Sequence, residues 1–532
     1  MHEIRPIARW ARVNNETVEG FEQIGVVAFH KDGIKEVRYK INTGSMGPSD
    51  LSLVLSNFGS LTTDGDLNGD GKVDAEDLSL VLANFGKEYE IVVTESRINH
   101  KTKVEEYSFD FDFSKLEYGA IVEVQATIIA NNDTILELKS PFSADLIING
   151  THSICLQNKA ACLIEYNVDP NGDDSNDGIE QPFKTIKKAL SVANYGDIIV
   201  LSDGEHLVED PKAKPQNGLS KWITVRGSGN TVVYSNGTFR TTGCIKFENL
   251  TVDIGRSGYS IGTYNIWWHN CKFYSPSTEA WWADGVAKHS YPDSSLKMNT
   301  KGNGNSFFRD GASVTDCWLD LYESGFGGCG IVRNSRLTRI WGDAFAMGCG
   351  VFNANVDDFV GYLTAKHSDL YQAWNDRTNV IFYGVTATRL ESVQAFLCRM
   401  KFEKSPPFDP AIHQQSALWN AAFVNCTIHH IPVSGRGFVN NGGPPFAQFS
   451  NKIHHVLFKN IKLPYQMIYV NGDEAIGWEH RDHKDVIFTD CDLHWKKFEE
   501  FTDPKKKWNA IEGGYEREGV RFLNCFNSVL KG

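Results

Sequence analysis

The sequence has few charges, and those it has do not favour the positive sign. Lys and Arg number 53 against 66 Asp and Glu, so the formal net charge is −13, and charged residues make up only 22% of the chain. Binding along a nucleic-acid backbone needs a basic face, so this composition predicts no nucleic-acid partner. No apolar run approaches the length that crosses a bilayer, which predicts no membrane insertion.

A secretory leader and an even cysteine count are also missing. The chain opens Met-His-Glu-Ile-Arg-Pro, without a basic segment followed by an apolar run. The eleven cysteines fall mostly inside strand-like segments, so we expect small buried hydrophobic side chains rather than a disulfide framework. Both features predict assembly in a reducing cytoplasm.

Glycine and aromatic residues are plentiful, at 47 residues and 12% of the chain. This composition is typical of a β-rich protein with many turns and argues against a helical bundle. A chain of 532 residues is too long for one ordinary core, so we expect several domains or one elongated repeat.

Near the N-terminus, polar and apolar residues alternate in 25–29 and 34–41, which predicts half-buried antiparallel strands. Strand patterns resume at 89–94, 105–113 and 120–129. We therefore predict that residues 1–44 and 87–150 form one immunoglobulin-like β-sandwich, interrupted by an insert at residues 45–86.

The insert contains an internal repeat. The segment Asp50-Leu-Ser-Leu-Val-Leu-Ser-Asn-Phe-Gly59 recurs almost unchanged at 77–86, which predicts two short helices that each end at a glycine. Residues 66–77, between them, follow the twelve-residue EF-hand calcium loop, with Gly71 at the sharp turn. The predicted Ca²⁺ ligands are Asp66, Asn68, Asp70, the carbonyl of Lys72, Asp74 and Asp77. Four carboxylates this close repel one another without a cation.

The calcium loop and the helix after it resemble half of a type I dockerin. The resemblance implies an interaction module that binds a cohesin, but the first helix here lacks the calcium loop that precedes it in a dockerin. A calcium-stabilised structural insert is therefore the favoured interpretation, with a dockerin-bearing interaction module as the alternative.

A different organisation begins near residue 160. A turn-rich strand at 168–178, an amphipathic segment at 182–190 and a buried strand at 196–201 are suited to capping the open end of a solenoid. This run resembles the opening segment of pectate-lyase-like proteins. The resemblance implies that residues 151–532 form a capped right-handed parallel β-helix, and the fold class is mainly β.

A degenerate motif then recurs along the β-helix: an apolar residue, any residue, Asn or Asp, two further residues, and an apolar residue. It occurs at 247–252, 268–273, 314–319, 332–337, 351–356, 423–428, 458–463, 488–493 and 522–527. Asn and Asp tolerate the left-handed backbone region, so we place them in the turn between two strands. The residue after the turn is expected to stack inward, and in five coils it is a cysteine: Cys271, Cys317, Cys426, Cys491 and Cys525.

One polar cluster is the candidate catalytic site. His367 and Asp369 share a strand face, and Asp343 is expected one coil away, so these three are the candidate catalytic residues. The candidate substrate-binding residues around them are Trp341, Gln372, Trp374, Arg399 and Lys401. An unpaired carboxylate inside a β-helix costs several kcal/mol, so the cluster is predicted to line an exposed glycan-contacting groove.

The cluster allows three interpretations. Glycoside hydrolysis would use the carboxylates of Asp343 and Asp369, whereas β-elimination would use Arg399, Lys401 or His367 as the base. The third interpretation is a polar ladder that stabilises the coils without catalysis.

The whole arrangement resembles virion-associated and tail-spike proteins of tailed phages. The resemblance implies a virion protein whose β-helix contacts surface glycans, with other virion proteins as partners and a homotrimer as the assembly. Such a protein is assembled in the cytoplasm and released by lysis. The alternative function is a polysaccharide lyase or glycoside hydrolase of the pectate-lyase-like fold.

Overall fold

The structure is a computed structural model of the 532-residue chain. It describes residues 4–13, 16–18, 20–42, 48–62, 64–66, 71–83, 88–113, 121–138, 152–156, 164–194, 196–209, 222–235, 244–254, 261–262, 266–274, 308–309, 312–322, 325–327, 330–346, 350–361, 368–373, 377–391, 393–398, 417–430, 447–449, 452–463, 483–493, 509–511, 514–517 and 520–526. Within these ranges, no helix is long and apolar enough to cross a membrane.

The N-terminal region contains two sheets that share one core. The strands are β1 (Ile7–Trp10), β2 (Glu16–Val18), β3 (Phe21–Phe29), β4 (Ile34–Asn42), β5 (Glu88–Val93), β6 (Arg97–Ile98), β7 (Glu105–Asp112), β8 (Ile121–Ala130), β9 (Ile135–Leu138) and β10 (His152–Leu156). One sheet has the order β1-β3-β7-β6 and the other β2-β10-β8-β4-β5, with β9 on β8. Trp10, Val26, Tyr39 and Ile128 belong to the shared core. The region extends past the expected boundary at residue 150, because β10 pairs with β8 and β2. The immunoglobulin-like topology stays a prediction.

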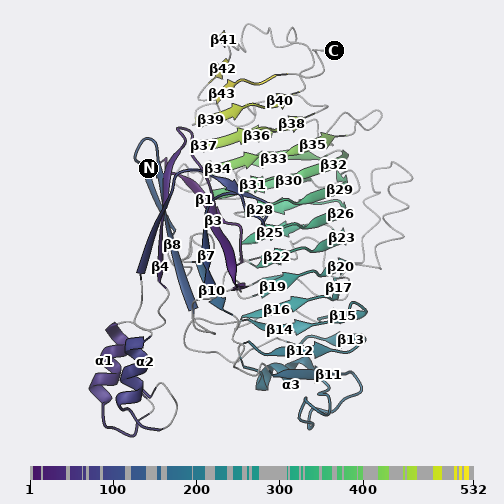
Figure 1. Ribbon diagram of the computed structural model, residues 1–532. Coiled ribbons are helices and arrows are strands. Elements are labelled where there is room, and N and C mark those ends of the chain that lie inside the picture. The colour runs from purple at the N-terminus through teal and green to yellow at the C-terminus, as the bar shows by residue number, and fades with distance from the viewer. Residues whose placement is uncertain are drawn as a thin grey trace, which may run out of the picture.

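Two helices, α1 (Pro48–Asn57) and α2 (Ala75–Ala83), lie between β4 and β5 in the chain. The two strands pair antiparallel, so the helices form an insert between neighbouring strands, as the sequence predicts. Val54 and Val73 form a small apolar contact between them. Figure 1 shows the two helices together at the foot of the N-terminal sheets, away from the stack of coils.

The second region is a parallel β-helix of three sheets. Sheet I contains β11 (Glu165–Val168), β12 (Ile198–Leu201), β14 (Ile223–Arg226), β16 (Ile245–Glu248), β19 (Ile266–His269), β22 (Ser313–Thr315), β25 (Ile331–Arg333), β28 (Gly350–Phe352), β31 (Arg377–Tyr383), β34 (Ala417–Val424), β37 (Lys452–Lys459), β39 (His483–Thr489), β43 (Val520–Leu523), β42 (Gly514–Arg517) and β41 (Asn509–Ile511), in that order. Sheet I is parallel up to β43, and β41 and β42 add to its last edge antiparallel.

The other two sheets are shorter and parallel. Sheet II contains β13 (Gly204–Leu207), β15 (Thr231–Tyr234), β17 (Thr251–Asp253), β20 (Lys272–Tyr274), β23 (Trp318–Tyr322), β26 (Arg336–Ile340), β29 (Asn355–Val360), β32 (Thr386–Glu391), β35 (Thr427–His430), β38 (Lys462–Leu463) and β40 (Asp492–Leu493). Sheet III contains β24 (Phe326–Gly327), β27 (Phe345–Ala346), β30 (Asp369–Ala373), β33 (Gln394–Cys398) and β36 (Ala447–Phe449), and β18 (Ile261–Gly262) pairs with β21 (Phe308–Arg309). The chain passes from sheet I to II to III within one coil, as β25, β26 and β27 show.

The turn from sheet I to sheet II confirms the recurring motif. All nine predicted Asn or Asp residues have φ between 49° and 57°: Asn249, Asn270, Asp316, Asn334, Asn353, Asn425, Asn460, Asp490 and Asn524. Some of their side chains bond from coil to coil, as Asn270 Nδ2 donates to Asn249 Oδ1 at 2.7 Å. The coil between those of Asn353 and Asn425 lacks the motif and has Gly384 at this position, with φ 68°. A Cβ there would meet Asn353 Oδ1 at 2.5 Å, so a larger residue at this position would have to displace the Asn353 amide.

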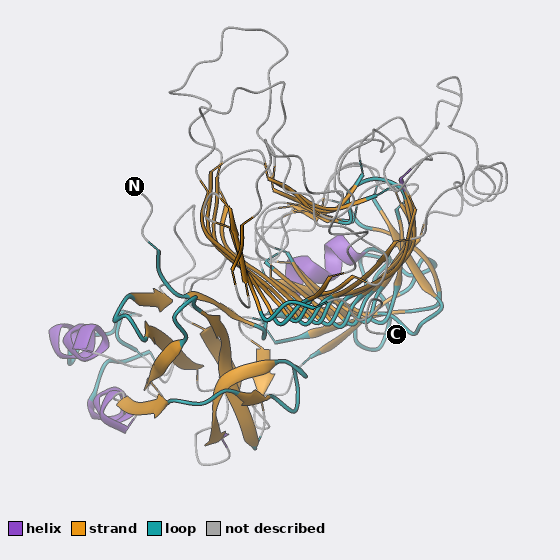
Figure 2. Cartoon of the chain, turned by 90° about the horizontal axis from the view of Figure 1, so that it is seen from above, coloured by secondary structure: helices purple, strands orange, loops and turns teal. Residues whose placement is uncertain are grey.

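The predicted cap is also confirmed. Helix α3 (Ile186–Val192) lies between β11 and β12, and its N-cap residue Thr185 accepts a hydrogen bond from the Lys188 amide at 3.1 Å. Ile186 and Leu190 are buried against the interior of the first coils. Figure 2, which looks along the stack, shows this helix inside the outline of the coils, where it covers the apolar end.

The N-terminal sheets pack on the outer face of sheet I, a contact that the sequence did not predict. Strand β1 is buried on both faces, because Ala8 and Trp10 belong to the core of the sandwich and Ile7 packs on the β-helix. Phe352 and Ile381 of sheet I belong to this second cluster. Sheet I therefore has apolar residues on both faces of its strands, as parallel sheets covered on both sides do.

A column of left-handed residues in sheet I supplies the polar part of this contact. Asn379, Asn420, His455 and Asp485 have φ between 50° and 57° and occupy successive coils. Asn379 Oδ1 accepts from the Ala8 amide at 3.1 Å, and Asn420 Oδ1 accepts from the Arg5 amide at 3.3 Å. Asn379, Asn420 and His455 thus each accept a hydrogen bond from a backbone amide of the N-terminal region, whereas Asp485 pairs with the Lys31 side chain.

His455 is the buried centre of this column. Its Nε2 accepts from the Lys31 amide at 3.0 Å and its Nδ1 lies 2.8 Å from Asn420 Oδ1, so the neutral ring with the proton on Nδ1 satisfies both contacts. The His30 ring centroid lies 4.6 Å away, and Lys31 Nζ pairs with Asp485 at 3.1 Å. Burial, then the nearby His30 and Lys31, lower the pKa of His455 to about 3.

This geometry predicts acid sensitivity. Above pH 6.5 His455 is neutral in both the folded and the unfolded state. Below that, only the unfolded state takes up the proton, and stability is lost progressively until the pH reaches the folded pKa near 3. From pH 6.5 to 4.5 we expect the wild type to lose roughly 2 kcal/mol more unfolding free energy than His455→Asn, whose side chain tolerates the left-handed backbone and does not titrate. Urea unfolding at several pH values measures this difference.

Groups common to both proteins cancel in that comparison. Burial lowers the pKa of His30 and raises the pKa of Glu106 to about 7, and these two residues have opposite effects on stability as the pH falls. Parallel pH profiles for the wild type and the variant would contradict the assignment to His455.

Candidate functional site

Two of the predicted catalytic carboxylates lie side by side in sheet III. Phe345 of β27 pairs with Tyr371 of β30, so Asp343 and Asp369, each two residues earlier, occupy the same position in neighbouring coils. The Asp369 amide donates to Asp343 Oδ1 at 3.2 Å. The structure therefore brings the two carboxylates together one coil apart, as the sequence predicts, while their catalytic role stays a prediction.

The expected exposure of this pair is wrong. Asp369 is completely buried and Asp343 is half-buried. Asp369 shares a strand face with Tyr371 and Ala373, and both of these belong to the interior core. The alternation of β30 therefore places Asp369 on the interior side of the strand, whereas the prediction placed it in an exposed groove.

Two of the five predicted substrate-binding residues are buried, and the other three lie outside the described residues. Trp341 and Gln372 are 1% and 4% exposed, so neither lies on the surface. The Trp341 carbonyl accepts a hydrogen bond from Ser368 Oγ at 2.7 Å, which ties the turn before β30 to the previous coil. His367, Trp374, Arg399 and Lys401 lie outside the described residues.

The calcium loop is described at four of its six predicted ligands, and Asn68 and Asp70 lie outside the described residues. The Gly71 amide, at φ 89°, donates to Asp66 Oδ2 at 2.8 Å. The Asp74 amide donates to Asp77 Oδ2 at 2.8 Å, and Asp77 is completely buried at the start of α2. Loop amides thus hold the first and last carboxylates of the loop, which fits the inward-facing oxygen ligands of a Ca²⁺ site. In the described part of the chain, no three His, Cys, Asp or Glu side chains gather as a metal site.

Among the described side chains of the helical insert, more apolar ones are exposed than buried. Its described core is Val54 and Val73, and the two segments beside the helices are joined by the Val73 amide donating to the Ser60 carbonyl at 3.0 Å. The exposed apolar side chains are Leu53, Leu55, Phe58, Leu61 and Leu82.

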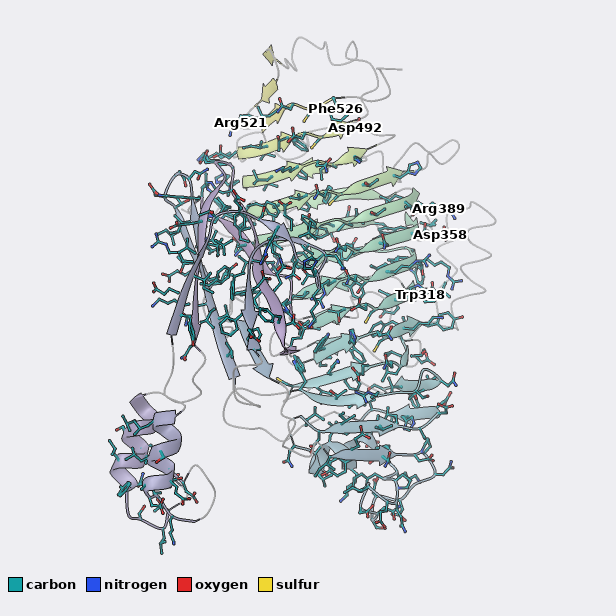
Figure 3. All side chains as sticks on the ribbon, in the orientation of Figure 1. Trp318, Asp358, Arg389, Asp492, Arg521 and Phe526 are labelled. Atoms are coloured by element: carbon teal, nitrogen blue, oxygen red, sulfur yellow. The ribbon has the colours of Figure 1, made fainter. Side chains whose placement is uncertain are left out.

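A site that the sequence reasoning missed lies on the outer face of sheet II. Trp318 is 36% exposed and stands in a row with Lys272 in the coil before it and Arg336 in the coil after it. Lys272 Nζ lies 4.3 Å from the centroid of the Trp318 ring and 4.6 Å from that of Tyr274. Arg336 Cζ lies 5.8 Å from the same Trp318 ring. Figure 3 places Trp318 on the side of the coils away from the N-terminal sheets.

Trp318 is held in place by a chain of hydrogen bonds. Its Nε1 donates to Thr338 Oγ1 at 2.6 Å, and Thr338 Oγ1 donates to Asp320 Oδ1 at 2.8 Å. Asp320 is completely buried and also accepts from Arg339 Nε at 2.8 Å. A ring that is fixed before a ligand arrives loses little conformational entropy on binding.

The row that contains Trp318 has cations and neutral polar residues. Its members through six coils are Thr251, Lys272, Trp318, Arg336, Asn355 and Thr386. The nearest described ion pair of the row joins Arg336 Nη2 to Asp357 Oδ2 at 3.7 Å, a long contact between partly exposed groups that contributes little. The sequence contained a signal for this site, because an aromatic residue takes the outward position directly after the inward Cys317 of its motif.

Comparisons with known proteins show only distant likeness. No family model matches the chain, and no curated protein matches it. The solved structure of pectate lyase Pel9A is similar at a TM-score of 0.24 and 11% identity, over 62% of this chain and 70% of that one. The family 28 exopolygalacturonase of Yersinia enterocolitica is similar at a TM-score of 0.29 and 9% identity, over 98% of this chain and 96% of that one. Activity and substrate do not transfer at such distances, and the β-helix rests on the parallel registers described above.

The buried position of Asp369 predicts a structural cost on mutation. Asp369 is completely buried, and Asp369→Asn would replace a carboxylate oxygen there with an amide NH₂ that water cannot solvate. We expect the free energy of unfolding to fall by about 1–3 kcal/mol in urea titrations. Asp357→Asn, on the partly exposed outer face of sheet II, is the control and should cost less than about 1 kcal/mol. Equal melting temperatures for the wild type and Asp369→Asn would contradict the structural role.

Proposed function

We propose that the outer face of sheet II binds an extended surface polysaccharide, with Trp318 as the aromatic platform for a sugar ring. The single observation that carries the proposal is the exposure of Trp318. Of the large apolar side chains described between residues 222 and 493, it is the one that is exposed. Exposed aromatic residues fixed by neighbouring contacts are typical of binding surfaces.

The charges beside Trp318 favour an acidic glycan. Lys272 contacts aromatic rings, and in the described part of the chain it has no carboxylate partner. A partly exposed ammonium and an exposed guanidinium in one row are suited to the carboxylates of uronic acids. Successive coils lie about 4.8 Å apart, so the row presents a side chain at each step along an extended chain of sugars.

A location in a phage virion has no support from the contacts of the described residues. It stays a prediction from the resemblance to tail-spike proteins. It includes the homotrimer and the contacts with other virion proteins. Mass spectrometry of purified phage particles tests the location, and sedimentation of the purified protein tests the trimer.

A polysaccharide lyase or glycoside hydrolase is the second candidate. The observation that favours it is the half-buried carboxylate of Asp343, which lies one coil from the buried Asp369 in sheet III. Two neighbouring carboxylates are the usual catalytic equipment of glycoside hydrolysis. New reducing ends or unsaturated uronates from a panel of bacterial polysaccharides, lost in a folded Asp343→Asn variant, would support it.

The glycan proposal predicts a selective loss on removing the ring. We expect Trp318→Ala to weaken binding of an acidic polysaccharide about tenfold, because stacking of an aromatic ring contributes roughly 0.5–1.5 kcal/mol. Trp318→Phe should keep part of the affinity, and Lys272→Gln should weaken acidic glycans more than neutral ones. Affinity electrophoresis with a uronate-containing and a neutral polysaccharide measures these effects.

Tyr89→Ala is the matched control, since Tyr89 is 41% exposed on β5 of the N-terminal sheets. Unchanged affinity in Trp318→Ala, or an equal loss in Tyr89→Ala, would overturn the placement of the site on sheet II.

We also propose that residues 66–77 bind one Ca²⁺, which would stabilise the insert. Asp66, Asp74, Asp77 and the Lys72 carbonyl would hold it together with Asn68 and Asp70. The support is the pair of hydrogen bonds that hold Asp66 and Asp77 at the two ends of the loop. The dockerin-like interaction module stays a prediction, and the exposed Leu55 and Leu61 are the observation in its favour.

Calcium binding is expected to appear as one site in a calorimetric titration of the full chain. Saturation at about a hundred times the Kd should stabilise the insert by about 2.7 kcal/mol. Asp66→Ala combined with Asp70→Ala should abolish the heat, whereas Asp64→Ala, an exposed carboxylate just before the loop, should leave it unchanged. Absence of a calcium site near neutral pH would overturn this part of the proposal.

A further inference from the structure

Two pairs of cysteines occupy neighbouring coils at the inward position after the left-handed turn. Lys272 pairs with Trp318, so Cys271 and Cys317, each one residue earlier, are in register. Thr489 pairs with Leu523, so Cys491 and Cys525, each two residues later, are also in register. The coils are joined at these points, because the Trp318 amide donates to the Cys271 carbonyl at 2.9 Å and the Phe526 amide to the Cys491 carbonyl at 3.0 Å.

Register places each pair at disulfide spacing. Neighbouring strands lie about 4.8 Å apart, and disulfides join Cα atoms that are about 4.4–6.8 Å apart. Residues in register on parallel strands point the same way, so the two sulfurs of a pair project to the same side. Their Cβ atoms then lie about 4.8 Å apart, slightly more than the roughly 3.5–4.5 Å of a disulfide, so a bond needs side-chain rotation and a small approach of the two turns.

The two pairs differ in access. Cys271 and Cys317 are both 2% exposed in the middle of the stack. Cys491 is completely buried, but Cys525 is half-buried in the last coil. Figure 3 shows Asp492 and Phe526, the residues that follow these two cysteines, close together at the C-terminal end of the stack.

The thiols also differ in reactivity. A hydrogen bond with Cys491 lowers the pKa of Cys525, which increases its thiolate fraction. Burial raises the pKa of Cys317 well above its usual range. Of these two pairs, the one in the last coil combines a half-buried cysteine, a lowered thiol pKa and a partner in register.

We propose that Cys491 and Cys525 form a disulfide between the last two coils when the folded protein meets a small-molecule disulfide. The Cys525 thiolate attacks one sulfur of the oxidant, and the first small thiol leaves with the proton that Cys525 gave up. Cys491 then loses its proton and attacks the Cys525 sulfur of the mixed disulfide, and the second small thiol leaves with that proton. Two protein thiols are oxidised and one disulfide is reduced to two thiols.

The bond would lock the open end of the β-helix. Strand β43 pairs in parallel with β39, and beyond it β42 and β41 continue the sheet antiparallel. Among the described residues, β43 has a parallel coil on its β39 side only, and this end of the stack is where we expect local opening to start. A cross-link to the coil before it removes that opening, while the inward cysteines still allow folding in the reduced state.

The test is to incubate the full chain with oxidised glutathione and map disulfide-linked peptides by mass spectrometry. We expect a Cys491–Cys525 bond first, with Cys271 and Cys317 still free, and a higher melting temperature that dithiothreitol reverses. Cys525→Ser should block the reaction, and Cys491→Ser should stop it at a glutathione adduct on Cys525. Cys317→Ser, the matched buried control, should leave the bond unchanged.

Three results would overturn the proposal. One is a wild type in which Cys491 and Cys525 both stay free, or in which glutathione remains on Cys525. Another is a bond from either residue to a different cysteine. The third is oxidation of Cys271 and Cys317 as fast as that of Cys491 and Cys525. Solvent access to the sulfur would then not determine which pair forms the disulfide.

Discussion

The left-handed residue between sheets I and II is the constraint on which the coil stack depends. A single residue at φ near 50° bends the chain from one sheet of the coil into the next, and Asn or Asp can adopt this conformation at low cost while bonding to the equivalent residue of the next coil. Once these turns stack, the strands on either side are held in register. Slipping by one residue would exchange the interior Phe423, Phe458 and Phe488 for outward residues.

Register explains the stacking inside and outside the coils. Phe423, Phe458 and Phe488 lie nearly parallel, with centroids 4.9 and 4.4 Å apart, because each occupies the same position in successive coils. The same arrangement places Lys272 beside Trp318 on the outer face of sheet II and Cys491 beside Cys525 at the inner turn. The interior stack, the proposed glycan surface and the proposed disulfide thus share one geometric cause.

The second left-handed column joins the two regions of the chain. Asn379, Asn420 and His455 each leave the regular pairing of sheet I and contact the backbone of the N-terminal residues. Apolar contacts around Ile7 and Ile381 complete the interface. The sandwich therefore covers the outer face of sheet I, and a ligand of the described coils must approach sheet II or sheet III instead.

Much of this fold could be predicted from local sequence. The nine Asn and Asp turns, the cap helix and the two insert helices follow from short-range chemistry, which needs no distant partner. The motif missed the Gly384 coil because a glycine, which also adopts positive φ easily, stands where the other coils have Asn or Asp. The second left-handed column also had a local signal, which the motif did not include. Its polar residues lie five positions before the turn residue, as Asn420 does before Asn425.

The sequence by itself determined the coil repeat, the inward cysteines and the loop suited to calcium, because each depends on residues close together in the chain. Only the tertiary structure decided which faces are covered. Side chains that alternate along a strand define its two faces, but the alternation does not say what packs against each face. The burial of Asp369 and the packing of β1 on sheet I therefore could not be predicted. Trp318 and its two cations come from coils up to 64 residues apart in sequence, from Lys272 to Arg336, and register alone brings them together.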